Sequence, residues 1–231
     1  IVGKYIQLED SYLSVIESLH HAGFDNKVKV NIKLIDCETI NKETAQEKLK
    51  GLQGIIVPGG FGNRGIEGKI TTIKYARENK IPFLGLCLGM QLSIVEFARN
   101  VIGYNDAHSV ELNPDTRHPV IHLMPDQEGI NDIGGTLRLG SYPCVLDENS
   151  LAYRLYGTKE IAERHRHRYE VNNSYVPQFE EKGMVISAKT PLEHLPEMME
   201  LHNHPFFFAV QFHPEFTSNP RFGHPVFKVY I

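Results

Sequence analysis

A cysteine between two glycines marks the stretch of this sequence that is best suited to perform chemistry. The run Phe83-Leu84-Gly85-Leu86-Cys87-Leu88-Gly89-Met90-Gln91 joins an apolar segment directly to an amphipathic one. The flanking glycines permit an abrupt turn from strand to helix, which is typical of a nucleophile elbow. At a helix N-terminus, free backbone N–H groups and the helix dipole favour the reactive thiolate. Cys87 is therefore a candidate nucleophile, and a buried structural cysteine is the alternative.

A thiolate nucleophile needs a base, and the base needs a group that orients it. The apolar run Phe208-Ala209-Val210-Gln211-Phe212 ends in His213-Pro214-Glu215. In an extended backbone, side chains two residues apart point to the same side, so we expect the Glu215 carboxylate to hold the His213 imidazole. A surface or structural histidine is the alternative for this one of 12 histidines.

Acyl chemistry also needs hydrogen-bond donors for an oxyanion. The N–H of Leu88, directly after the cysteine, is one candidate. A second can come from Pro58-Gly59-Gly60, where the glycines let backbone approach a ligand closely. A phosphate cradle or a plain turn would have similar residues, but the Gly-Lys-Ser/Thr ending of a P-loop is missing.

The segments that must position these residues alternate between strands and helices in the first half of the chain. We expect strands at residues 1–6, 28–35, 54–57 and 81–86, and helices from the Asp10-Ser11 cap to Gly23 and at 45–49, 70–77 and 88–99. Such alternation predicts a parallel sheet with helices on both faces. Ligands collect at the carboxyl ends of these strands, which is where Gly59, Gly60 and Cys87 fall.

The second half has a different texture, with polar and proline-containing segments between its strands. Strands are expected at 119–123, 136–145, 184–188 and 206–212. This pattern predicts an antiparallel addition and then a return to the main sheet. We find no internal repeat and no long linker, so residues 1–231 are interpreted as a single domain.

Composition excludes several classes of protein. The 231 residues are 41% hydrophobic and 23% charged, with a net charge of −4 and a pI near 6.3, which gives no general attraction to nucleic acid or anionic membranes. Three cysteines make no disulfide framework, so a reducing, cytoplasmic setting is expected. No apolar run is long enough to span a bilayer. The chain begins at Ile1 and not at Met, so we expect an excised domain with a shortened first strand and last helix.

Three motifs together resemble the class I (triad) glutamine amidotransferases. They are Pro58-Gly59-Gly60-Phe61-Gly62 with Arg64-Gly65, the elbow around Cys87, and His213-Pro214-Glu215. Two further segments resemble the CTP synthases within that family, and the resemblance runs from residue 2 to about residue 225. They are Gly134-Gly135-Thr136-Leu137-Arg138-Leu139-Gly140 and Glu163-Arg164-His165-Arg166-His167-Arg168-Tyr169-Glu170-Val171-Asn172. The resemblance implies a flavodoxin-like α/β fold.

The resemblance also implies a role for individual residues. Cys87 is the implied nucleophile, His213 the general base and then acid, and Glu215 its orienting partner. Gly60 and Leu88 would form the oxyanion hole. The rest of the implied glutamine site is Leu88, Gly89, Met90 and Gln91 lining the pocket, Glu111 at the α-amino group and Arg168 at the α-carboxylate.

The two clamp residues have plainer interpretations. Glu111 lies in a polar stretch, and a merely solvated side chain is the alternative. The alternating run 164–168 is also compatible with a solvent-facing strand, a nucleic-acid patch or a metal site; alternation would put its arginines on one face and its histidines on the other. Three positive charges on an acidic domain are thin support for nucleic acid. Zinc is disfavoured because the histidines have no neighbouring cysteine and no helical i, i+4 spacing, so no metal site is predicted.

What the resemblance implies beyond this chain is an N-terminal synthetase domain that uses ATP and magnesium to activate UTP for amination. Glutamine hydrolysis here would supply its ammonia. The family further implies activation by GTP near the loop that holds Arg64, and a homo-oligomeric (tetrameric) full enzyme. No nucleic-acid or membrane partner is expected.

Three other interpretations remain. Another triad amidotransferase, such as that of GMP synthase, is disfavoured by residues 134–140 and 163–172. A cysteine peptidase would have no use for the clamp of Glu111 and Arg168. A non-catalytic regulatory domain with the same fold would need none of Cys87, His213 and Glu215.

Overall fold

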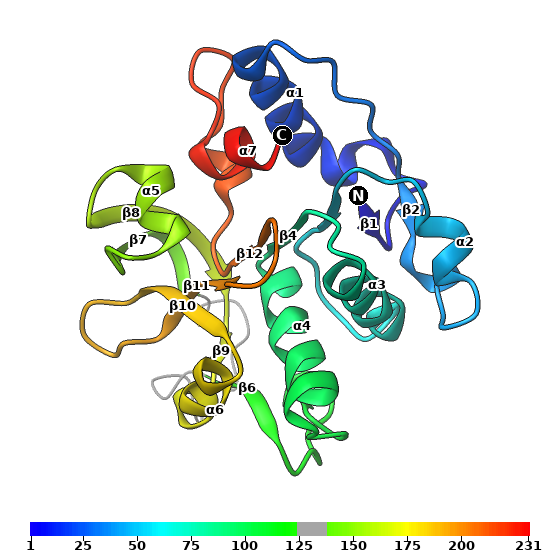
Figure 1. The fold of residues 1–231 in the computed structure, drawn as a ribbon, viewed down its shortest axis with the longest axis vertical. Coiled ribbons are helices and arrows are strands. Elements are labelled where there is room, and N and C mark those ends of the chain that lie inside the picture. Colours follow the sequence, from blue (N-terminus) through cyan, green and yellow to red (C-terminus); the bar gives the residue numbers. More distant parts are fainter. Residues whose placement is uncertain (124–137) are drawn as a thin grey trace.

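The computed structural model describes residues 1–123 and 138–231, and within them the main feature is a seven-stranded sheet (Figure 1). Its order is β3-β4-β12-β11-β10-β7-β8. The strands β3, β4 and β12 are parallel to one another, and the remaining pairs are antiparallel. The predicted parallel centre with an antiparallel addition is confirmed. The strands are β3 (Ile55–Val57), β4 (Phe83–Leu86), β12 (Phe207–Val210), β11 (Pro196–Leu201), β10 (Met184–Lys189), β7 (Arg138–Leu146) and β8 (Glu160–His167).

Two small sheets and several helices complete the described residues. β1 (Val2–Gly3) pairs in parallel with β2 (Ile35–Asp36), while β6 (Pro119–Leu123) lies between β5 (His108–Ser109) and β9 (Tyr169–Val171). A π-helical turn, Ala98–Ile102, extends the elbow helix α4. The α-helices are α1 (Leu13–Asn26), α2 (Ala45–Leu49), α3 (Ile66–Glu78), α4 (Leu88–Phe97), α5 (Leu151–Tyr156), α6 (Val176–Glu181) and α7 (Pro225–Tyr230).

The central strands are apolar at every position because both of their faces are covered. Phe83 and Phe207 belong to one core cluster, together with side chains of α3 and α4, and their rings stack at 4.5 Å. Leu84 and Phe208 point the other way into a second cluster, with side chains of α1, α5 and α7. Period-two alternation thus divides each strand between two cores, as expected for a parallel sheet buried on both sides.

The predicted strand at 28–35 is wrong except at its end, since only Ile35 and Asp36 form β2. A strand needs a neighbour for its backbone groups, and β1 offers only Val2 and Gly3, with one more bond from the Ile35 N–H to the Ile1 carbonyl. The alternating pattern of residues 28–34 therefore has no strand to pair with in the described structure. The predicted strand at 136–145 starts outside the described residues and continues as β7.

Gly68 on α3 allows the closest backbone contact among the described glycines. A Cβ placed there would lie 1.8 Å from the Cys37 carbonyl oxygen. We expect Gly68→Ala to lower the free energy of unfolding by about 2–3 kcal/mol, since the helix must move away. Denaturant unfolding measures this, with Thr71→Ala on the same helix as the control that should change stability by less than about 0.5 kcal/mol. Equal stability of Gly68→Ala and the wild type would contradict the packing described.

Candidate active site

Cys87 lies at the sharp junction of β4 and α4. Its backbone has φ 50° and ψ −103°, a conformation that a residue with a side chain rarely adopts. Holding a non-glycine residue there costs about 1–3 kcal/mol, so the surrounding structure must enforce it. The N–H of Cys87 donates to the Val210 carbonyl at 2.8 Å, which ties the junction to β12. The predicted nucleophile-elbow geometry is confirmed.

The two flanking glycines are needed for close packing. A Cβ on Gly89 would lie 2.1 Å from the carbonyl oxygen of Val57 in β3, and one on Gly85 would lie 2.9 Å from the backbone of Gly89. Any side chain at these positions would push α4 away from the sheet. The glycines therefore let the N-terminus of α4, with its free N–H groups, lie directly at the strand end.

His213 and Glu215 lie at the same edge of the sheet as Cys87. β12 runs parallel to β4 with Val210 opposite Leu86, so the chain leaves both strands side by side. His213 Nδ1 is 2.7 Å from Glu215 Oε1, and the imidazole lies near enough to the Cys87 side chain for the two to interact. The expected extended backbone is wrong here, because Pro214–Phe216 forms a 3-10 turn, yet this turn still returns the carboxylate to the imidazole.

The protonation of His213 is set by these two neighbours. Burial alone lowers its pKa, but hydrogen bonds to Cys87 and Glu215 outweigh burial and raise the pKa of His213 to about 10. The side chain is therefore an imidazolium at neutral pH. A protonated histidine beside a cysteine is suited to stabilise a thiolate and to donate a proton to a leaving group.

The backbone of strand β8 contacts both His213 and Cys87. The N–H of His213 donates to the Arg164 carbonyl at 2.8 Å, and the Cys87 Sγ lies 4.0 Å from the Arg166 carbonyl oxygen. Gln211 Nε2 lies 3.8 Å from the same sulfur. Neither β8 nor Gln211 was predicted to contact Cys87, since these contacts depend on how the antiparallel strands close over the site.

The glycine loop touches both reactive side chains. A Cβ on Gly59 would lie 3.0 Å from the His213 ring and 3.5 Å from the Cys87 Cβ. A Cβ on Gly60 would lie 3.9 Å from the Leu88 side chain, so the two expected oxyanion donors are neighbours. The structure thus brings the Gly59-Gly60 loop and the N-terminus of α4 together around Cys87.

Met90 and Gln91, which follow in the 88–91 segment, are both buried but make different contacts. The Met90 side chain has no exposed surface and belongs to the core cluster of α3 and α4, so only its backbone is available to a ligand. Gln91 donates to the Tyr169 carbonyl at 3.0 Å and to Gln211 at 3.4 Å. Its amide therefore links α4 to β9 and to the residue that follows β12.

Glu111 and Arg168, the expected substrate clamp, are near enough for their charges to interact. Glu111 is half-buried in the loop after β5, and Arg168 is half-buried in the bend between β8 and β9. Burial raises the pKa of Glu111, and the positive charge of Arg168 opposes that rise. The next residue, Tyr169, accepts the hydrogen bond from Gln91, so Arg168 adjoins the segment that follows Cys87.

The alternation of arginines and histidines in β8 is confirmed for four residues and fails for the fifth. Arg164 and Arg166 are exposed, while His165 and His167 are buried. Arg168 lies outside the strand and so does not share the arginine face. Of the glycine-rich motif at 134–140, residues 134–137 lie outside the described residues.

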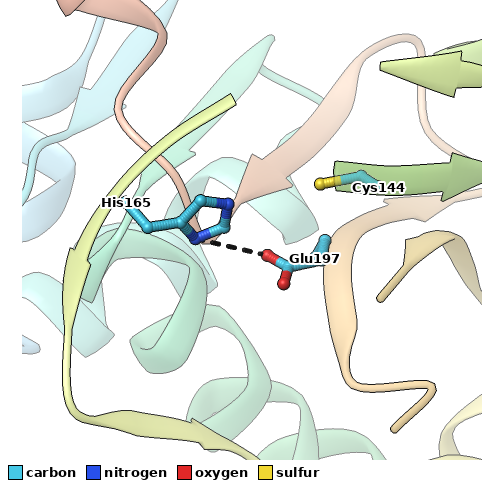
Figure 2. Close-up of side chains that lie close together, drawn as sticks. All are labelled: Cys144, His165 and Glu197. Atoms are coloured by element: carbon cyan, nitrogen blue, oxygen red, sulfur yellow. Dashed lines mark ion pairs between the residues drawn. The ribbon is translucent and has the colours of Figure 1, made fainter. Parts of the chain in front are cut away.

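The inward face of β8 belongs to a group of five buried side chains, which we call the buried histidine cluster: Arg138, His165, His167, Glu170 and Glu197. Arg138 binds Glu170 at 3.2 Å and also binds Glu197, and the two histidine rings share a 2.8 Å contact. Figure 2 shows His165 beside Glu197, 3.6 Å apart, with the Cys144 sulfur close to both side chains. The expectation that these histidines have no nearby cysteine is therefore wrong in space, because pairing of β7 with β8 brings Cys144 close.

Cys144, His165 and Glu197 offer ligand atoms within 4.8 Å of one another. Glu197 is already bound to a guanidinium, however, and burial raises its pKa to about 7, so the group can be balanced by protons. Burial also raises the pKa of Cys144 well above its usual value and lowers that of His167 to about 3. Because Glu197 is held by Arg138 and lies beside His165, we explain these side chains as a buried ion-paired part of the core and assign no metal to them.

One residue at the site that the motifs did not indicate is Lys69 on α3. It has only 2% of its surface exposed, and a Cβ on Gly60 would lie 3.7 Å from its ammonium nitrogen. A signal was present in the sequence, since Lys69 falls on the helix face of Ile66 and Ile73, where apolar residues are expected.

Over residues 1–123 and 138–231, no helix is long and apolar enough to cross a membrane.

Comparisons with known proteins agree with this geometry. The family model described as glutamine amidotransferase class-I matches residues 7–231. The CTP synthase of Halalkalibacterium halodurans is 56% identical over the whole chain, which spans 43% of that relative, and the CTP synthase of Staphylococcus carnosus is likewise 56% identical with 43% spanned. The chain thus covers less than half the length of these relatives.

Solved structures show the same relationship. The glutaminase domain of Trypanosoma brucei CTPS with bound acivicin superposes with a TM-score of 0.93 at 38% identity, covering 99% of this chain and 90% of that one. A glutamine amidotransferase from Thermotoga maritima shares the fold, with a TM-score of 0.53 at 12% identity over 93% of this chain and 74% of that one. The chain therefore belongs to the class-I glutamine amidotransferase family, within which it groups with the CTP synthases.

Proposed function

We propose that the chain hydrolyses the side-chain amide of L-glutamine to glutamate and ammonia. The observation that carries this proposal is the meeting of Cys87, His213 and Glu215 at one edge of the sheet, where the imidazole is bonded to Glu215 and interacts with Cys87. The family match and the likeness to a domain whose title calls it a glutaminase support the same reaction.

The reaction follows from the side chains present. The Cys87 thiolate attacks the carboxamide carbon, and the N–H groups of Gly60 and Leu88 donate hydrogen bonds to the negatively charged tetrahedral oxygen, each contributing about 3–4 kcal/mol in the transition state. His213 gives its proton to the departing nitrogen, the C–N bond breaks, and a γ-glutamyl thioester with ammonia results. His213 then takes a proton from water, whose oxygen attacks the thioester and releases glutamate and the thiolate.

The α-amino group and the α-carboxylate of the substrate glutamine need binding groups of their own. Glu111 accepts hydrogen bonds from the α-amino group, and Arg168 donates to the α-carboxylate. Their opposite charges are near each other, as the ends of an amino acid require. Gly89, Met90 and Gln91 border the side-chain pocket, with Met90 contributing through its backbone because its side chain is in the core.

Ammonia needs a destination, because free ammonia largely protonates in water and ceases to be a nucleophile. We propose that it passes to a synthetase domain N-terminal to this chain, where ATP and magnesium activate UTP for conversion to CTP. The support is the 53–56% identity to CTP synthases that are more than twice as long. GTP activation near Arg64, a homo-tetrameric full enzyme and a cytoplasmic location belong to the same proposal.

Covalent trapping tests the glutaminase assignment without relying on turnover. The chain is exposed to a glutamine analogue that alkylates activated thiols, with acivicin as a second probe, and adducts are located by intact-mass and peptide mass spectrometry. We expect a single adduct on Cys87 that free glutamine suppresses, while the buried Cys37 and Cys144 stay unlabelled. Equal labelling of all three cysteines, or none, would overturn the proposal.

Replacing Arg168 with alanine should mainly weaken glutamine binding. Loss of a charge-assisted bond to the α-carboxylate is worth about 2–3 kcal/mol, so the KM for glutamine should rise about 30- to 100-fold with little change in kcat. Steady-state glutamate release measures both constants, with the exposed Arg221→Ala as the matched control. An unchanged KM would remove Arg168 from the clamp.

A further inference from the structure

A lysine with almost no exposed surface lies beneath the glycine loop. Lys69 is among the largest fully buried side chains of the described residues, with 2% of its surface exposed. Within residues 1–123 and 138–231, its ammonium makes no ion pair with a carboxylate. Burying an uncompensated charge costs several kcal/mol, so such a lysine is retained only where its charge serves a purpose.

The location of the ammonium points to the site around Cys87. A Cβ on Gly60 would lie 3.7 Å from Lys69 Nζ, which places the charge directly against the glycine loop. Burial lowers the pKa of Lys69, and of its charged or titratable neighbours the thiols of Cys37 and Cys87 oppose this shift while Lys4 adds to it. All of these neighbours except Lys4 are potential anions, and none is a carboxylate.

Cys37 is not an effective counter-charge for this lysine. Burial raises the pKa of the Cys37 thiol, and Lys69 only partly opposes that rise, so Cys37 is neutral at physiological pH. Cys87 differs because it lies at a helix N-terminus and hydrogen-bonds with the His213 side chain. The anion that remains for Lys69 is the negative charge of the reacting centre.

The glycine loop is held between two lysines. Lys4 Nζ donates to the Phe61 carbonyl from one side, and a Cβ on Gly62 would lie 3.5 Å from the same nitrogen. Lys69 lies against the neighbouring Gly60 from α3. Two cations on one short loop create a positive potential where an oxyanion would form.

We propose that Lys69 is a positioning residue of the glutaminase site, whose buried charge stabilises the Cys87 thiolate and the oxyanion through the Gly59-Gly60 loop. This inference rests on the proposed glutamine hydrolysis. It adds a cation from α3 to the site at the ends of β3, β4 and β12, and it explains the presence of a charge on the apolar face of a helix.

The test compares K69M, which keeps the length of the side chain and removes its charge, with K69R, which keeps the charge. The rate of Cys87 alkylation by the glutamine analogue is measured against pH for each. We expect K69M to react about ten-fold more slowly at pH 7 and its alkylation midpoint to move to higher pH, since a charge close by in a partly buried site has an effect of about this size. K69R should restore most of the rate.

Thermal unfolding separates this role from a structural one. Because K69M removes an unpaired buried charge, its melting temperature should equal or exceed that of the wild type. Lys74→Met, at an exposed position on the same helix, is the matched control and should alkylate as the wild type does. Normal rate and midpoint in K69M, or K69R as slow as K69M with both folded, would overturn the role of the charge. Absence of trapping in the wild type would overturn glutamine hydrolysis instead.

Discussion

Replacing Cys87 with alanine should reduce glutamine turnover by about 10⁶-fold, which is below detection in a glutamate-release assay. Neither of the other two cysteines can take over the attack, because Cys37 and Cys144 are fully buried in the two core clusters. The proposed clamp of Glu111 and Arg168 is untouched, so glutamine should still bind. Titration calorimetry on the variant measures that binding directly.

Cys144→Ala is the matched control for the loss of a thiol. Cys144 contacts the buried histidine cluster and does not contact the glycine loop, so this variant should keep turnover within a few-fold of the wild type and lose only stability (Figure 2). Wild-type turnover in Cys87→Ala would show that the elbow is structural. Loss of glutamine binding together with turnover would show that the sulfur serves the pocket more than the reaction.

The local geometry of the nucleophile could be predicted because it depends on neighbours in the sequence. Gly85 lies against the backbone of Gly89, and Gly89 lies against the Val57 carbonyl, so neither position has room for a side chain. The apolar segments 54–57 and 81–86 indicated the two strands that bring these atoms together. A buried parallel centre requires apolar residues on both faces, so its sequence is unmistakable.

Segments whose structure depends on distant partners were predicted poorly. β11 (Pro196–Leu201) contains methionine and glutamate and is a strand because β10 and β12 pair with it on both sides. Residues 28–34 have the better strand pattern but only the short β1 as a neighbour. The contact of Cys144 with His165, and that of Lys69 with the glycine loop, likewise arise from the packing of elements far apart in the sequence.

Replacing Glu215 with glutamine should lower kcat by about 10³-fold with a small change in KM, since an amide can neither orient nor stabilise the imidazolium as a carboxylate does. In the wild type, burial lowers the pKa of His213, but the bonds to Cys87 and Glu215 raise it to about 10. Removing one of these bonds lowers that value. The high-pH limb of the kcat profile should therefore move to lower pH in Glu215→Gln.

The raised pKa of His213 also predicts how the stability of the protein depends on pH. The folded-state pKa of His213 lies above its ordinary value of 6.5, so protonation of His213 favours folding. That stabilisation is fully present below about pH 6.5 and is lost as the pH rises through about 10. The stability difference between wild type and Glu215→Gln should thus be largest in mild acid and shrink toward pH 10, while the exposed Glu181→Gln should show no such trend. A difference that grows with pH would mean that Glu215 acts on some group other than His213.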